Sequence, residues 1–124
     1  MNNAPRALVV EDELLIAMAM EDVLQDLGYE VVGPFSTVGQ ARGAAEGEPL
    51  DLGVLDMNLR GELVFPIAEA LRRRGVPVVF CTGYADMPLI PESFRNTPIL
   101  SKPCTPDGIR AAIERSLSPL PAES

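Results

Sequence analysis

The sequence predicts an α/β fold, in which a five-stranded parallel sheet is covered by helices on both faces. Two observations lead to this prediction. Short apolar runs typical of buried strands recur along the 124 residues, and amphipathic helical patterns separate them. The apolar share of 47% and the charged share of 23% are those of a globular chain.

The predicted strands are five apolar runs bounded by polar or turn-forming residues. They cover residues 7–10, 29–35, 50–56, 76–82 and 98–101. Pro34 lies in the second run and cannot donate a backbone hydrogen bond, so we expect this strand at a sheet edge. Right-handed crossovers then favour the strand order 2-1-3-4-5, a flavodoxin-like doubly wound sheet.

The first two predicted helices have clear boundaries. The first follows the first strand and ends at Gly28, and its apolar stripe consists of Ala17, Met20, Leu24 and Leu27. The second begins at Thr37, which has capping-box spacing to Gln40, and closes at Pro49. Its inward residues are expected to be Val38, Ala41 and Ala44.

The second half of the chain predicts two further helices and one irregular segment. Residues 63–74 form a helix that starts near Pro66 and stops before Gly75. The last helix has Thr105 as N-cap and Pro106 as first residue, with an inner stripe of Ile109, Ile113 and Leu117. Between strands four and five, Pro88, Pro91 and Pro98 predict a short or absent fourth helix. Residues 118–124 are expected to be a frayed tail.

Composition excludes several classes of function. A net charge of −8 disfavours binding to nucleic acid, and the chain has no histidine to act as a general base or metal ligand. No apolar run approaches the ~20 residues of a membrane helix. No signal peptide is evident, and Cys81 and Cys104 are expected to be free thiols, with a reactive thiol at Cys104 as the minor alternative. We therefore expect one cytoplasmic domain over residues 1–124.

Chemically useful side chains follow every central strand. Glu11 and Asp12 follow the first strand, Asp56 ends the third, Thr82 ends the fourth and Lys102 follows the fifth. Ligands of open α/β sheets bind beyond the carboxyl ends of the strands, so these groups are expected to converge there. Each has an ordinary interpretation when taken alone. Asp12 is a good helix N-cap, and a single lysine is most often a solvated surface residue.

This pattern resembles the receiver domain of two-component response regulators, which has the CheY-like form of the flavodoxin-like fold. The resemblance covers about residues 6–118. It is carried by Glu11-Asp12, Asp56, Thr82 and Lys102-Pro103 in that order. The stretch FCTGY at 80–84 is also similar to a mostly stand-alone subgroup whose motif reads Phe-Ala-Thr-Gly-Tyr, with Cys81 at the alanine position.

The resemblance implies that Asp56 accepts a phosphoryl group from a histidine kinase or a histidine phosphotransfer protein. It also implies a Mg²⁺ ion held by Asp12, Asp56 and the backbone carbonyl of Asn58, with Glu11 as supporting or further ligand. This cation would offset the repulsion between the carboxylate and the phosphoryl group.

The resemblance also assigns the switch residues. Lys102, followed by Pro103, would pair with a phosphoryl oxygen, and Thr82 would donate to another. Receivers often carry an aromatic residue three positions before the lysine, but this chain has Ile99 there. We therefore expect Tyr84 to replace that aromatic residue in the switch.

The expected function is a single-domain response regulator without an output domain. It would signal through contact with a downstream protein, or act as a relay or phosphate sink, and would not be an enzyme acting on free substrates. One alternative is a haloacid-dehalogenase-like phosphatase, although Asn58 lacks the carboxylate that such an enzyme uses as general acid. Another is a receiver-like binding module that is never phosphorylated.

Overall fold

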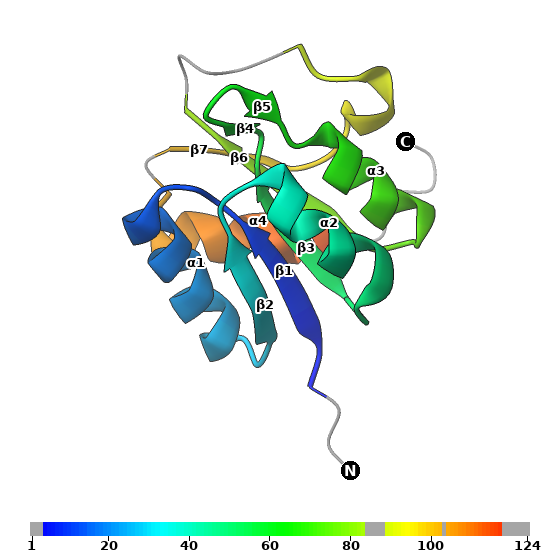
Figure 1. The fold of residues 1–124 in the computed structure, drawn as a ribbon. Coiled ribbons are helices and arrows are strands. Elements are labelled where there is room, and N and C mark those ends of the chain that lie inside the picture. The colour runs from blue at the N-terminus through cyan, green and yellow to red at the C-terminus, as the bar shows by residue number, and fades with distance from the viewer. Residues whose placement is uncertain (1–3, 84–88, 103, 118–124) are drawn as a thin grey trace, which may run out of the picture.

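The computed structural model describes residues 4–83, 89–102 and 104–117. The main sheet is parallel and has five strands in the order β2-β1-β3-β6-β7, which is the predicted 2-1-3-4-5 (Figure 1). Its strands are β1 (Arg6–Val10), β2 (Glu30–Phe35), β3 (Leu52–Asp56), β6 (Val78–Thr82) and β7 (Ile99–Ser101). The predicted flavodoxin-like fold is therefore confirmed, with the Pro34 strand at an edge.

In the described part of the chain, four α-helices cover the two faces of this sheet (Figure 1). They are α1 (Leu14–Asp26), α2 (Val38–Gly47), α3 (Phe65–Arg73) and α4 (Pro106–Leu117). Successive side chains of a strand point to opposite faces of the sheet, so alternate residues of β1 belong to two different hydrophobic cores. Leu8 and Val10 pack with α2 and α3, whereas Ala7 and Val9 pack with α1 and α4.

The predicted helix boundaries follow from caps that the structure contains. The Thr37 side chain accepts a hydrogen bond from the backbone N–H of Gln40 at 3.1 Å, and Thr105 accepts one from Gly108 at 3.0 Å. Each bond satisfies an N–H of the first turn that has no partner within the helix. Gly28 follows α1 with a φ of +93°, a conformation that favours glycine.

A small hairpin before α3 was not predicted. β4 (Asn58–Leu59) and β5 (Glu62–Leu63) pair antiparallel around Arg60 and Gly61, whose φ values of 56° and 94° are both positive. Two-residue hairpin turns favour such φ values. The predicted helix start at residue 63 is therefore wrong, and α3 begins at Phe65, beside the Pro66 that the sequence indicated.

Two of the predicted inward side chains are placed differently. Leu117 was expected to continue the inner stripe of the last helix, but it is 48% exposed at the end of α4. In α2 the fully buried alanine after Ala41 is Ala45, and Ala44 is only partly buried against the core. Leu117 is the last residue of α4, whereas Ala44 lies beside the buried stripe that Val38, Ala41 and Ala45 form.

The segment before β7 contains a short helical turn. In its described part, residues 89–98, the helical element is the 3-10 helix η2 (Glu92–Phe94). Phe94 is buried there against Phe65 and Phe80, with ring centroids 6.0 and 5.5 Å away. Pro88 lies outside the described residues, as does the expected tail at 118–124. No described helix has the length and apolar character needed to cross a membrane.

Candidate functional site

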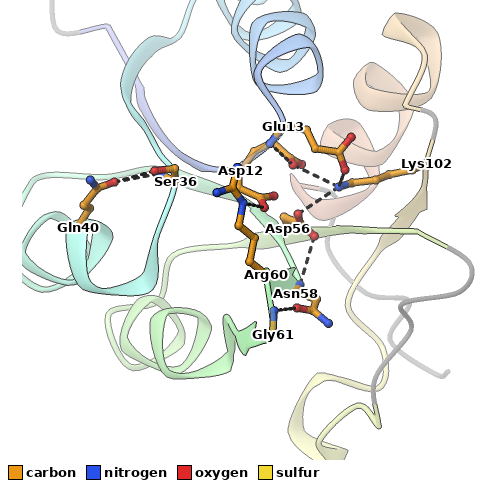
Figure 2. Close-up of polar contacts among 10 residues, drawn as sticks. Asp12, Glu13, Ser36, Gln40, Asp56, Asn58, Arg60, Gly61 and Lys102 are labelled. Atoms are coloured by element: carbon orange, nitrogen blue, oxygen red, sulfur yellow. Dashed lines mark hydrogen bonds and ion pairs between the residues drawn. The ribbon is translucent and has the colours of Figure 1, made fainter.

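The site lies at the carboxyl ends of four neighbouring strands, where the sequence predicted it. Glu11 and Asp12 follow β1, Asp56 is the last residue of β3, and Lys102 follows β7. Figure 2 shows the Asp12, Asp56 and Lys102 side chains directed into one small region. The parallel registers of β1, β3 and β6 bring these strand ends to the same edge.

Lys102 is the centre of the polar network. Its Nζ donates to Glu13 Oε2 at 2.9 Å and to Asp56 Oδ2 at 3.1 Å (Figure 2). It also donates to Glu11 Oε2 at 3.2 Å. The side chains of Glu11 and Asp56 are 0% and 3% exposed, so these ion pairs are screened little by solvent. One ammonium therefore contacts three carboxyl groups at once.

Asp12 is held from the opposite side of the cluster. Arg60 Nε lies 3.1 Å from Asp12 Oδ2, and the Arg60 side chain is 82% exposed. Asp12 is not the N-cap of α1, so that interpretation of it is wrong. Glu13 occupies the cap position and makes no side-chain capping bond there.

The hairpin fixes the residues that follow Asp56. The backbone N–H of Asn58 donates to Asp56 Oδ1 at 3.2 Å, and the Asn58 side chain accepts from Gly61 N–H at 2.6 Å (Figure 2). Both oxygens of Asp56 therefore have a defined donor, one from Asn58 and one from Lys102. These two hydrogen bonds fix the orientation of the Asp56 carboxylate at the carboxyl end of β3.

The three carboxylates fit a divalent cation. Glu11, Asp12 and Asp56 each offer an oxygen, and these atoms lie within 4.8 Å of one another. Among the described residues, Glu11 Oε1 is buried without a hydrogen-bond partner. Counting Glu13, the ionised cluster has four negative charges against the two positive charges of Lys102 and Arg60. The excess of two negative charges and the all-oxygen ligands suit Mg²⁺.

Burial and charge shift the pKa values of these groups. Burial raises the pKa of Glu11 to about 8, and the negative charge of Asp56 also acts to raise it. The hydrogen bonds from Glu13 N–H and Lys102 act in the opposite direction. Burial also raises the pKa of Asp56, despite the bonds from Lys102 and Asn58. For Lys102, burial acts to lower the pKa, but the bonds to Glu13 and Asp56 outweigh it and the pKa is raised. Lys102 is therefore a stable cation.

Thr82 is buried at the end of β6, 1% exposed. Its hydroxyl donates a long hydrogen bond of 3.3 Å to the carbonyl of Gly83. Its own carbonyl accepts from the backbone N–H of Lys102 at 2.9 Å, so the two residues are linked through the main chain. Tyr84 and Pro103, the other predicted residues of this region, lie outside the described residues. Ile99 is partly buried against the core.

Two ion pairs of the network were not predicted from the sequence. Glu13 belongs to the acidic run after β1, but its ion pair with Lys102 depends on the fold. Arg60 pairs with Asp12 from the turn of the β4–β5 hairpin, which the sequence did not predict. The Arg-Gly pair at 60–61, between two short apolar segments, was the signal for a turn at this point.

Comparisons with known proteins agree with the geometry. Residues 7–114 match the model of the response regulator receiver domain family. The chain is similar to the phyllosphere-induced regulator PhyR of Methylorubrum extorquens, with 31% identity over 92% of this chain and 44% of that protein. It is also similar to the transcriptional regulatory protein PdtaR of Mycobacterium tuberculosis, with 30% identity over 91% of this chain and 57% of that protein. The chain thus spans about half the length of these curated relatives.

A solved structure matches over nearly the whole chain. The solution structure of SdrG from Sphingomonas melonis Fr1 has a TM-score of 0.82 and 43% identity, covering 95% of this chain and 100% of that one. The family match and the two relatives each extend across most of the residues that build the sheet and its acidic edge. This chain belongs to the response regulator receiver domain family.

Proposed function

We propose that the chain is a phosphoacceptor of two-component signalling that receives a phosphoryl group on Asp56. The observation that carries the proposal is the position of Asp56 Oδ2, 3.1 Å from Lys102 Nζ and inside a cluster of three carboxylates. A nucleophilic carboxylate needs such cationic support, because its own charge repels a phosphoryl group. The donor is a phosphohistidine of a sensor kinase or of a histidine phosphotransfer protein.

In the proposed reaction, an oxygen of Asp56 forms a bond to phosphorus while the phosphorus–nitrogen bond of the donor breaks. The electron pair of that bond leaves with the imidazole. Asn58 N–H and Lys102 hold the carboxylate in place before the transfer. Lys102 then pairs with a phosphoryl oxygen as a point charge.

Glu11, Asp12, Asp56 and the backbone carbonyl of Asn58 are the proposed ligands of Mg²⁺, which when bound offsets the negative charge of the phosphoryl group. The fit rests on the clustered carboxylate oxygens and on the unpartnered Glu11 Oε1. The ion pair between Arg60 and Asp12 must break when Asp12 binds the cation. An exposed arginine can make this exchange at small cost.

Output is proposed to follow from a local change at Thr82. A phosphoryl group brings roughly −1.5 to −2 charge and three acceptor oxygens. The Thr82 hydroxyl, which makes only a long bond to Gly83, is available to donate to one of them. The shifted loop would favour contact with a downstream protein, or the chain would pass the group on as a relay or sink. Tyr84 remains our proposed aromatic partner in this switch.

The proposed contact for the donor is the start of α1, beside Glu13. Leu14, Leu15 and Met18 are exposed there by 73%, 79% and 49%. A cluster of exposed apolar side chains marks a site of protein contact more often than isolated ones do. We also propose a cytoplasmic location, because sensor kinases draw their phosphoryl groups from ATP.

Acetyl phosphate or phosphoramidate with Mg²⁺ tests the proposal directly. We expect intact mass to show one added phosphoryl group that hydroxylamine removes, as for an acyl phosphate. Asp56→Asn should abolish the addition, and Asp26→Asn, a change at a 76% exposed carboxylate at the far end of α1, should not. An unmodified wild type, or equal labelling of Asp56→Asn, would contradict the proposal. Multiple turnover of a phosphomonoester would instead support the phosphatase alternative.

A further inference from the structure

Two cysteines meet beside the site without belonging to the carboxylate network. Cys81 lies in β6, and Cys104 precedes α4. They are 23 positions apart in sequence, yet their Sγ atoms are 2.6 Å apart. Both are free thiols, and they are the only cysteines of the chain. The fold therefore brings together two groups that can form a covalent bond with each other.

The two thiols differ in access. Cys81 is fully buried in the core between the sheet and the layer of α1 and α4, whereas Cys104 is only partly buried. A dissolved reagent can therefore reach Cys104 first. Cys81 is too deeply buried for a dissolved reagent to reach, so the neighbouring Cys104 sulfur is the partner with which it can react. Cys81 is therefore placed to act as a resolving thiol.

Their protonation supports the same division of roles. The hydrogen bond with Cys81 lowers the pKa of Cys104, burial opposes this, and the charge of Lys102 lowers the pKa further. The bond to Cys104 and burial both raise the pKa of Cys81. Cys104 is therefore the sulfur with more thiolate character, which is the reactive form. Once Cys104 has reacted, the bond that raises the pKa of Cys81 is lost.

We propose that Cys81 and Cys104 are a reversible disulfide site, oxidised by small disulfides such as oxidised glutathione. The Cys104 thiolate attacks one sulfur of the reagent, forming a mixed disulfide and releasing one thiolate. Cys81 gives up its proton to solvent and attacks the Cys104 sulfur, which releases the second thiolate. Both leaving thiolates end as thiols. The chain loses two electrons and two protons, and one reagent disulfide becomes two thiols.

Proximity favours the intramolecular product. A disulfide has a sulfur–sulfur distance of about 2.05 Å. The two sulfur atoms are already in contact, 2.6 Å apart, so no large rearrangement is needed to join them. At the proposed cytoplasmic location, which is a reducing compartment, disulfides are mostly transient or redox-sensing, so a reversible bond fits better than a structural one. The proposal does not depend on phosphorylation, since its chemistry needs neither Mg²⁺ nor a phosphoryl donor.

The test is native-state oxidation of the full chain by oxidised glutathione, without Mg²⁺ or phosphoryl donor. We expect wild type to lose both free thiols without forming disulfide-linked dimers, and its intact mass to fall by two hydrogens with no glutathione retained. Dithiothreitol should restore both thiols. The Cys81→Ser variant, with Cys104 alone, should stop at the glutathione adduct, and Cys104→Ser should keep its buried thiol unreacted.

Three results would overturn the proposal. They are a stable glutathione adduct on wild type, disulfide-linked dimers as the main product, and equal reaction rates of the two single variants. Circular dichroism of each variant before oxidation checks that it is folded. The same oxidation in urea provides the reference, because only the folded chain holds the two sulfurs together. Wild type should therefore close its disulfide at least tenfold faster when folded than when unfolded.

Discussion

Lys102 has a special position among the residues of the site. It is the only lysine in the chain, and its ammonium contacts three carboxylates at once. Lysine binds as a compact point charge, so it can serve several oxygens in different directions. An isotope label placed on lysine side-chain amines would therefore report on this site alone.

Arg60 is predicted to compete with a cation for Asp12. The Arg60→Ala change removes the ion pair to Asp12 Oδ2 and leaves that oxygen free. We expect Mg²⁺ affinity to rise by up to about fivefold, because exposed ion pairs are worth about 0.2–1 kcal/mol. Isothermal titration calorimetry at low ionic strength measures the change.

The matched control for Arg60→Ala is Arg110→Ala. Arg110 is a partly exposed arginine in α4 that pairs with Asp26 at 3.8 Å. Its removal takes the same charge from the molecule but leaves the cluster untouched. An equal rise in Mg²⁺ affinity in both variants would mean that only net charge matters, and the role assigned to Arg60 would then be wrong.

The sequence was sufficient to predict which residues meet at the sheet edge. Asp56, Thr82 and Lys102 each end or follow a central strand, and strand order alone brings such ends together. It was not sufficient for Arg60 or for the ion pair of Glu13, because those contacts depend on the direction of a hairpin and on side-chain reach. Neither contact produces a periodic pattern in the sequence from which it could be predicted.

Among the elements, the edge strand β2 depends on one glycine. Gly33 has a φ of +107°, and an added Cβ would lie 2.8 Å from both the Phe35 nitrogen and the Val9 oxygen. Both are backbone atoms, which cannot move aside cheaply. The next backbone bond, from Glu11 N–H to the Phe35 carbonyl at 2.9 Å, anchors the start of the acidic segment.

Gly33→Ala is therefore predicted to destabilise the fold by about 1–3 kcal/mol. Gly43→Ala is the matched control, since Gly43 lies inside α2 and an added Cβ meets nothing within 4 Å. That change should stabilise the fold by about 0.5–1 kcal/mol, because alanine is the better helix former. Urea unfolding of the two variants measures both effects. Equal stability of the two would refute the strain assigned to Gly33.

The sequence predicted element types better than element ends. The spacing of apolar residues and the capping residues predicted the four described α-helices and the five strands of the main sheet, because these elements depend on local sequence pattern. The hairpin of β4 and β5 was missed because each of its strands has only two residues, too few to show alternation. Leu117 fitted the helical stripe, but α4 extends beyond the surface it packs against.

At the scale of the whole molecule, stability is predicted to fall as pH rises in the absence of Mg²⁺. The pKa of Glu11 is raised from 4.5 to about 8, so between these values the folded chain holds a proton that the unfolded chain has lost. The stabilising effect is complete below the unfolded pKa and is lost as pH approaches 8. Asp56, whose pKa is also raised, acts in the same direction.

Urea unfolding in chelator at about pH 6 and about pH 8 measures this change. Cys104, whose pKa is lowered, acts in the opposite direction near the upper value. The control is Glu11→Gln, which keeps that thiol and should reduce the fall in stability. Added Mg²⁺ should stabilise wild type more at the higher pH, because protons then compete less for the carboxylates. A wild type equally stable at both values without Mg²⁺ would contradict the prediction.

The backbone hydrogen bond between Lys102 N–H and the Thr82 carbonyl should couple the effects of substitutions at these two positions. It continues the β6–β7 ladder one step past the last paired strand residues, Thr82 and Ser101. The main chains that carry the hydroxyl and the ammonium are therefore displaced together when that corner of the sheet moves. Substitutions at the two positions should show epistasis, so that the tolerance of one site depends on which residue occupies the other.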